Sequence, residues 1–198
     1  MLMGAEMAYT AKDYEKALHI YKQLKDKAAS MERRQLAKTG MLRSAHMLGN
    51  EEEIIFTATD LLADTKLAPE LSNEAHYYRA KAYLDAGKTD GAMEDLKILA
   101  KDTRNVYGAE AKYKVAQIYF DGGQTDKAEQ EVLNYIEVST PHTYWLARSF
   151  VLLADVYMKS GRNLDAKQYL LSLKQNYQAD DDIAGMIESR LEKLKTEN

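Results

Sequence analysis

Histidine and carboxylate side chains are the groups in this chain that could carry acid–base or metal chemistry. The histidines are His19, His46, His76 and His142. No two of them have the i, i+4 spacing that presents two ligands to one metal from a helix. The acidic runs at 51–53 and 180–182 are typical of a solvated helix face or a helix start, because an acid–base pair needs environments that drive two pKa values apart. We therefore expect no metal site, no cofactor and no catalytic residue.

The residues that several other kinds of site require are also missing from the sequence. The chain has no cysteine, which removes disulfides, thiolate nucleophiles and cysteine-ligated zinc. The glycine pair after Asp121 lacks the spacing of a phosphate-binding loop and is explained by a turn. The 27 basic and 31 acidic residues are interleaved and sum to a net charge of -4, so no basic stripe is available for nucleic acid. These features predict a protein that is not an enzyme and does not bind nucleic acid.

The composition says little about the compartment. The longest apolar stretches, such as 150–154, are far shorter than the roughly 20 residues that span a bilayer, so no transmembrane segment is expected. The N-terminus shows no charged leader followed by an apolar run, and no secretory signal is visible there. A chain without cysteine suits either redox setting, so this argument leaves the compartment open.

The pattern that positions these side chains recurs five times. A small or aliphatic anchor is repeated at Ala17, Ile54, Ala92, Ala128 and Ala166. The differences between successive anchors are 37, 38, 36 and 38 residues, and a fixed period of this size is typical of a stacked repeat array. Five residues before each anchor lies a turn residue, in order Lys12, Gly49, Gly87, Gly123 and Gly161. Apolar residues at helical spacing flank each turn, so each copy is predicted to be a helix hairpin.

This pattern resembles the tetratricopeptide repeat (TPR) family. The resemblance is clearest in three copies of Ala-x-x-Tyr-x-x-x-Gly-x-x-x-x-Ala that begin at Ala80, Ala116 and Ala154. The chain departs from the family at Ile54, where alanine is expected, in lacking a proline at the end of most copies, and in a period longer than the usual length of about 34 residues. These departures affect the expected stacking angle rather than the repeat assignment.

The resemblance implies an all-α fold, a right-handed α-solenoid of about five TPR-like helix hairpins plus a C-terminal capping helix. We expect a single superhelical domain over residues 1–198. The repeats are expected at about 1–28, 32–67, 71–103, 107–138 and 141–177, with the capping helix over 181–195.

The two ends of the array differ. Counting back from Ala17, the chain opens inside its first repeat with apolar residues: Met1, Leu2, Met3 and Met7. An intact solenoid usually starts with a polar capping unit, so we expect that the array continues upstream; the alternative is a short natural N-terminus. At the other end, the aspartates at 180–182 favour a helix start. The apolar stripe of the expected capping helix follows at Ile183, Ile187, Leu191 and Leu194.

Two segments carry a narrower resemblance. Residues 140–149 and 170–177 look like the C-terminal repeats of long TPR proteins of bacterial cell envelopes. That resemblance implies a periplasmic or envelope-associated protein, with a cytoplasmic location as the alternative. We interpret Tyr144 and Trp145 as packing between repeats rather than a ligand site, because aromatic side chains dominate helical cores by area.

The surface built by the first helix of each hairpin is the candidate binding site. Side chains eight residues before the anchors are Tyr9, His46, Leu84, Phe120 and Met158, and those fifteen before are Thr39, Tyr77, Tyr113 and Val151. In a stacked array each set forms a ladder, and such a strip suits a peptide with apolar anchors. The groove residues that we predict are Tyr77, Lys81, Leu84, Tyr113, Gln117, Phe120, Val151, Asp155 and Met158. The alternative is that several of them are half-buried packing within a hairpin.

The predicted function is a noncatalytic protein–protein interaction scaffold that binds a peptide or protein segment in this groove. Co-chaperone members of the TPR family hold a carboxylate with a Lys and an Asn one turn apart, and no copy here supplies that pair, so a chaperone tail is not the expected partner. One alternative is a structural segment that self-associates through its N-terminal end. Another is an accessory subunit of an enzyme or envelope assembly. The sequence does not identify the protein partner.

Overall fold

The structure is a computed structural model of the chain and describes residues 1–196. All regular secondary structure within these residues is helical, which confirms the predicted all-α class. Internal contacts gather the chain into two compact units, Met1–Ile98 and Leu99–Asn198, which we call unit 1 and unit 2. The single superhelical domain expected from the repeat stays a prediction.

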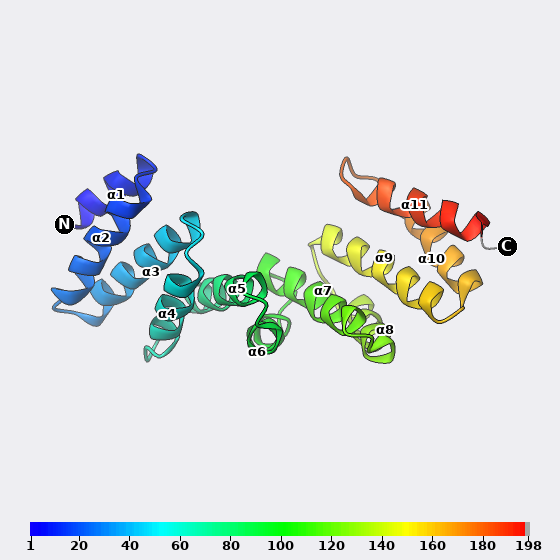
Figure 1. Ribbon diagram of the computed structural model, residues 1–198, viewed down its shortest axis with the longest axis horizontal. Coiled ribbons are helices and arrows are strands. Elements are labelled where there is room, and N and C mark those ends of the chain that lie inside the picture. Colours follow the sequence, from blue (N-terminus) through cyan, green and yellow to red (C-terminus); the bar gives the residue numbers. More distant parts are fainter. Residues whose placement is uncertain (197–198) are drawn as a thin grey trace. The chain divides into compact units, whose positions relative to one another are not determined.

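Each unit is a series of helix hairpins in chain order (Figure 1). The hairpins of unit 1 are α1 (Leu2–Thr10) with α2 (Tyr14–Asp26), α3 (Met31–Met47) with α4 (Glu51–Leu62), and α5 (Pro69–Asp85) with α6 (Thr89–Leu99), whose last residue opens unit 2. Unit 2 has α7 (Val106–Asp121) with α8 (Thr125–Ile136), α9 (Thr143–Lys159) with α10 (Asn163–Asn176), and the final helix α11 (Ile183–Thr196). Each hairpin and the final helix begin within about two residues of the predicted starts. The helix α4 ends at Leu62 and α6 ends at Leu99, short of the predicted repeat ends at 67 and 103, and the repeat bounds stay a prediction.

A residue in the left-handed backbone conformation lies just after the first helix of each hairpin. The φ angles are 64° at Gly49, 70° at Gly87, 74° at Gly123 and 74° at Gly161, and the first hairpin has Lys12 at 61°. Glycine adopts this conformation without a steric penalty because it has no Cβ. The turn positions predicted from the sequence are therefore confirmed. In the first hairpin the turn residue is Lys12, which has a Cβ and therefore pays a steric penalty in this conformation.

Within each unit, helices pack against neighbours in the chain, and the first helices also pack against one another. In unit 1, α1 contacts α3, and α3 contacts α5; in unit 2, α7 contacts α9, and α9 contacts α11. The five anchors are all buried where the two helices of a hairpin cross. Small side chains at such a crossing allow the backbones to approach closely. The first helices thus form one layer in each unit, with the second helices behind them.

The two units have different cores. In unit 2 one apolar cluster extends from α7 to α11 and includes Leu153 and Leu170. The predicted stripe of the capping helix is buried in this cluster, and the Asp181 carboxylate accepts a hydrogen bond of 3.0 Å from the Ile183 N–H at the start of α11. Unit 1 has two smaller clusters, one around Tyr21 in the first hairpin and one around Leu61 further along.

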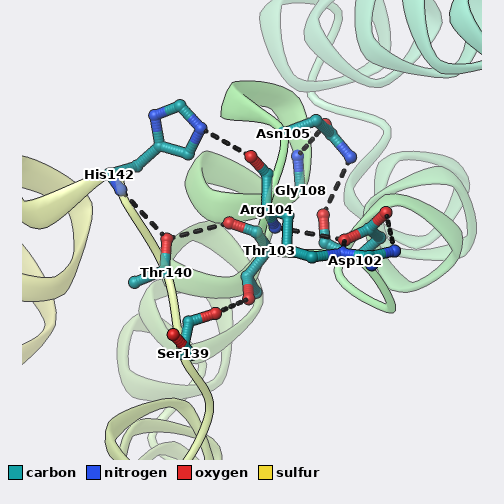
Figure 2. A network of polar contacts seen from close by, with 8 residues as sticks. All are labelled: Asp102, Thr103, Arg104, Asn105, Gly108, Ser139, Thr140 and His142. Carbon is teal, nitrogen blue, oxygen red and sulfur yellow. Dashed lines mark hydrogen bonds and ion pairs between the residues drawn. The ribbon is translucent and has the colours of Figure 1, made fainter.

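Polar contacts join the loop before α7 to the loop before α9 (Figure 2). The Thr140 hydroxyl donates to the Thr103 carbonyl oxygen at 2.8 Å, and the Thr103 hydroxyl donates to the Ser139 carbonyl oxygen at 3.4 Å. The His142 Nε2 lies 3.0 Å from the carbonyl oxygen of Arg104 and must carry the proton, since a carbonyl only accepts. Successive repeats of unit 2 are therefore joined through their loops as well as through their helices.

The same loop caps α7. The Asn105 side chain accepts a hydrogen bond from the Gly108 N–H at 2.9 Å and donates one to the Asp102 carbonyl oxygen at 2.8 Å. A Cβ on Gly108 would overlap that carbonyl oxygen and lie 2.7 Å from the carbonyl oxygen of Leu99. Only glycine fits at this approach of helix and loop.

Some apolar side chains stay on the surface. Met1, Met3 and Met7 at the N-terminal helix are exposed, Met3 to 74%. Among the helices of residues 1–196, none combines the length and the hydropathy that a bilayer crossing requires.

Candidate binding surface on the first helices

The predicted groove residues of unit 2 lie on α7 and α9, but two of them are buried. Tyr113 is 5% exposed and Val151 is 3% exposed. The Tyr113 ring packs against Trp145 at a centroid distance of 5.6 Å, and its hydroxyl donates to Gln117 Oε1 at 2.8 Å. Tyr113 and Val151 therefore agree with the alternative that some of the nine side chains are packing within the array, and Tyr113 is covered by residues of the next first helix, α9. Binding by the predicted groove residues stays a prediction. Trp145 packs between helices, as predicted.

Arg148 closes the surface over Tyr113. Its guanidinium donates to the Tyr113 hydroxyl at 3.1 Å and lies 5.1 Å from the centre of that ring. The same group donates to the Tyr144 hydroxyl at 3.1 Å and pairs with the Asp182 carboxylate at 3.3 Å. One cation thus joins α7, α9 and the start of α11.

The other predicted side chains of unit 2 also have intramolecular partners. Gln117 donates to the Asp121 carboxylate at 2.8 Å, and the half-buried Phe120 has the ammonium of Lys159 5.0 Å from its ring centre. Asp155 forms a bidentate pair with Arg190 of α11 at 2.7 and 2.6 Å. Met158 is half-buried against the core. The inner face of unit 2 is therefore already occupied by its own polar and aromatic contacts.

In unit 1 the predicted residues Tyr77, Lys81 and Leu84 lie along α5. Tyr77 and Leu84 are half-buried, and the exposed Lys81 has its ammonium 5.5 Å from the centre of the Tyr77 ring. Lys81 also borders a cavity of about 170 Å³ in which the His46 ring stacks on Tyr78 at 4.2 Å. Burial, together with the nearby charge of Lys81, lowers the pKa of His46, so its imidazole is neutral at pH 7.

The larger opening of unit 1 lies between α1 and α3. This cavity of about 400 Å³, which we call the α1–α3 cavity, is lined by Glu6, Tyr9, Tyr21, Glu32, Gln35, Leu36, Thr39, Gly40, Arg43 and Leu71. All of these except Tyr21 come from the first helices α1, α3 and α5. The sequence placed Tyr9 and Thr39 on the inner ladder but did not predict the cavity. The signal was Gly40, a buried glycine inside a helix.

Gly40 explains the floor of the cavity. A Cβ there would overlap the ring of Tyr21, so the missing side chain lets that ring pack against the α3 backbone. Burial raises the pKa of both Tyr21 and Tyr9, so their hydroxyls stay neutral at physiological pH. The floor is therefore aromatic and uncharged.

The rim of the cavity is acidic. Arg43 is held by Glu74 through two hydrogen bonds of 2.6 and 2.8 Å, which neutralise its charge. Glu6 and Glu32 are exposed, and neither carboxylate forms an ion pair with another residue in the range 1–196. Two acidic residues that line the opening thus have no fixed counter-charge among the described residues.

The repeat register explains why the Glu6 carboxylate forms no ion pair within residues 1–196. Glu6 and Arg43 are equivalent in the repeat, because each lies eleven residues before the anchor of its own copy. Leu36 and Glu74 are also equivalent, because each lies eighteen residues before the anchor of the copy that follows. At the α3–α5 crossing these two positions form the Arg43–Glu74 pair. At the α1–α3 crossing the same positions hold Glu6 and Leu36, which cannot form one.

Other titratable side chains of unit 1 join one helix to the next. In unit 1, Asp95 of α6 is 1% exposed and receives two hydrogen bonds of 2.8 and 2.7 Å from Arg79, while His76 Nδ1 lies 2.7 Å from Asp95 Oδ1. The sequence did not predict this network, which joins α5 to α6. Within residues 1–196 no cluster of three metal-ligating side chains occurs.

Comparisons with known proteins agree with this architecture. Residues 74–102 match the family model described as tetratricopeptide repeat. A crystal structure of MamA is similar with a TM-score of 0.67 and 18% identity, covering 98% of this chain and 97% of that one. A kinesin light chain structure from Podosopora anserina, with nearly identical TPR-like repeats, has a TM-score of 0.60 and 19% identity and covers 86% of this chain and 90% of that one. No curated protein sequence matches the chain.

Identities this low establish the fold and not the activity. The family match, the hairpins that end in left-handed residues and the buried small anchors all describe the same architecture. Residues 74–102 form a tetratricopeptide repeat, and the chain has the fold of tetratricopeptide-repeat proteins.

Proposed function

We propose that the protein is a noncatalytic interaction module that binds a polypeptide segment on the first helices of unit 1. The observation that carries the proposal is the α1–α3 cavity, which opens on the helix layer where the repeat predicts binding. Its volume of about 400 Å³ suits one or two side chains of a bound segment. The seven predicted groove residues that are not buried are further candidate contacts: Tyr77, Lys81, Leu84, Gln117, Phe120, Asp155 and Met158.

A steric block tests this proposal. Leu36 is 43% exposed at the cavity, and Leu171 is 47% exposed on α10 of unit 2, so tryptophan fits at both positions without entering a core. We expect that short random peptides displayed on phage and selected on the wild-type chain also bind Leu171→Trp, and bind Leu36→Trp at least about tenfold more weakly. Circular dichroism checks that both variants keep their helical content. Failure to select any peptide, or equal binding to both variants, would contradict the proposal.

A second candidate function is self-association through the N-terminal helix, which the exposure of Met1, Met3 and Met7 favours. Sedimentation velocity over a range of concentrations tests it. Self-association would appear as a sedimentation coefficient that rises with concentration and falls back in Met3→Ser/Met7→Ser. A monomer at all concentrations would remove this candidate. The bacterial envelope location stays a prediction of the narrower sequence resemblance.

A further inference from the structure

We infer that the α1–α3 cavity accepts a lysine or arginine side chain of the bound polypeptide segment, an inference that rests on the proposed function. Such a side chain has an aliphatic stem and a cationic end, and each part needs a different surface. The cavity offers both kinds of surface within one opening of about 400 Å³.

The cationic end is matched by the rim and the floor. Glu6 on α1 and Glu32 on α3 border the opening, and both are exposed carboxylates. The rings of Tyr9 and Tyr21 line the same space, and a cation over the face of an aromatic ring is attracted to it. Carboxylates beside neutral aromatic rings favour a cation over an anion or a neutral polar group.

The cation already at the site does not oppose this ligand. Arg43 borders the cavity, but both of its hydrogen bonds to Glu74 are charge-assisted and bidentate, and the Glu74 side chain is 11% exposed. Its charge is therefore balanced within unit 1. Of the charged groups that line the cavity, Glu6 and Glu32 are left to interact with a ligand.

The aliphatic stem is matched by Leu36 and Leu71, which line the cavity from α3 and α5. Leu36 occupies the repeat position at which the next copy has Glu74. A partner side chain with a positive end would supply to Glu6 the counter-charge that this position does not provide. The proposed ligand thus completes a pair that the α3–α5 crossing forms internally.

The experiment compares pools of short fluorescein-labelled peptides by fluorescence anisotropy. Each pool has one fixed central residue, Arg, Lys, Leu or Glu, within randomised neutral flanks. We expect the Arg and Lys pools to bind the wild-type chain about tenfold more tightly than the Leu and Glu pools, with a preference that weakens as salt is raised. Free arginine and spermidine serve as competitors that carry the cation without a polypeptide.

Two double variants assign the preference to the rim. Glu6→Gln/Glu32→Gln removes both carboxylates without changing their size and should reduce the preference for the Arg and Lys pools to about twofold or less. Glu15→Gln/Glu52→Gln changes the net charge equally at exposed positions of α2 and α4 that do not border the cavity, and it should leave the preference unchanged. All four positions are exposed, so neither variant should affect folding.

The outcomes separate the two proposals. If all pools bind equally, if the Leu or Glu pool binds best, or if the preference survives Glu6→Gln/Glu32→Gln, the cationic ligand is wrong while peptide binding stands. If free arginine or spermidine binds as tightly as the peptides, the site takes a small cation and the polypeptide ligand is wrong. If no pool binds the wild-type chain, the proposed function fails and this inference fails with it.

Discussion

The surfaces formed by the first helices of the two units use the same repeat positions, but the surface is covered by its own side chains in unit 2 and contains a cavity in unit 1. Fifteen residues before the anchors, α3 of unit 1 has Thr39 whereas α7 of unit 2 has Tyr113; eighteen before, α3 has Leu36 whereas α9 of unit 2 has Arg148. The difference is confined to these helices, because α5 of unit 1 has Tyr77 and Glu74 at the same two positions. In unit 2 the larger side chains bond to each other and bury the surface. In unit 1 the smaller ones leave the α1–α3 cavity.

This difference separates what the repeat fixes from what it leaves free. The anchors and turn residues determine how hairpins form and stack, and these positions are equivalent in both units. The inner-face positions do not determine stacking, so their side chains can either satisfy one another or stay open to a partner. We therefore associate binding with the unit whose inner face is incompletely satisfied.

The largest expected effect comes from adding a methyl group at two glycines, one in each unit. At Gly108 the new Cβ would overlap backbone oxygens, whereas at Gly40 it would overlap the ring of Tyr21, which borders an open cavity. A ring can move into empty space and a backbone carbonyl cannot. We expect Gly108→Ala to lower the free energy of unfolding by at least about 3 kcal/mol, and Gly40→Ala by about 1 kcal/mol.

Urea unfolding followed by circular dichroism measures both glycine variants. Gly4→Ala is the control, because a Cβ there meets no atom within 4 Å. Equal losses for Gly108→Ala and Gly40→Ala would mean that the cavity does not relieve overpacking, and the contrast between closed and open inner faces would weaken.

The sequence predicted the hairpins because their determinants are local. Anchors, turn glycines and the stripe of Ile183, Ile187, Leu191 and Leu194 act within one or two helices, and each lies as expected. The burial of Tyr113 depends instead on Trp145 and Arg148 of the next hairpin. The unpaired carboxylate at the cavity depends on Glu6 and Leu36, which occupy the positions of the Arg43–Glu74 ion pair but cannot form one. Periodicity places a side chain on a face, but it does not tell which neighbour fills the space beside it.

A second prediction compares a buried aspartate of unit 1 with a half-exposed one of unit 2. Asp95 and Asp155 each form a bidentate pair with an arginine, but Asp95 is almost fully buried. Replacement by asparagine leaves each arginine without a charged partner. We expect Asp95→Asn to lower the free energy of unfolding by about 3 kcal/mol at pH 7, and Asp155→Asn by about 1 kcal/mol.

The pH dependence distinguishes charge from packing at Asp95. Burial raises the pKa of this carboxyl, but the hydrogen bonds and charges of Arg79 and His76 outweigh that effect and hold the pKa below its usual value. The stabilisation is therefore fully present above the unfolded-state pKa of about 3.9 and is lost as the pH falls through the lower folded-state value. The stability difference between wild type and Asp95→Asn should shrink below about pH 4. A difference that is constant with pH would show that the carboxylate charge is not responsible.

The smallest expected effect concerns the turn at which the first hairpin differs from the hairpins of unit 2. Lys12 has a φ of 61°, whereas Gly123 and Gly161 adopt the same conformation without a Cβ. A left-handed residue other than glycine costs about 1–2 kcal/mol, and glycine costs about 0.5–1 kcal/mol more than alanine in unfolded-chain entropy, so the steric term is larger. Lys12→Gly should therefore raise the free energy of unfolding by about 0.5–1 kcal/mol in urea titrations.

The reverse change, Gly161→Lys, should lower the free energy of unfolding by a similar amount, because a Cβ there meets no atom within 4 Å and only the backbone conformation is at issue. If both variants lower stability, the Lys12 side chain stabilises the first hairpin through a contact that outweighs its strain, and the five turns are not equivalent.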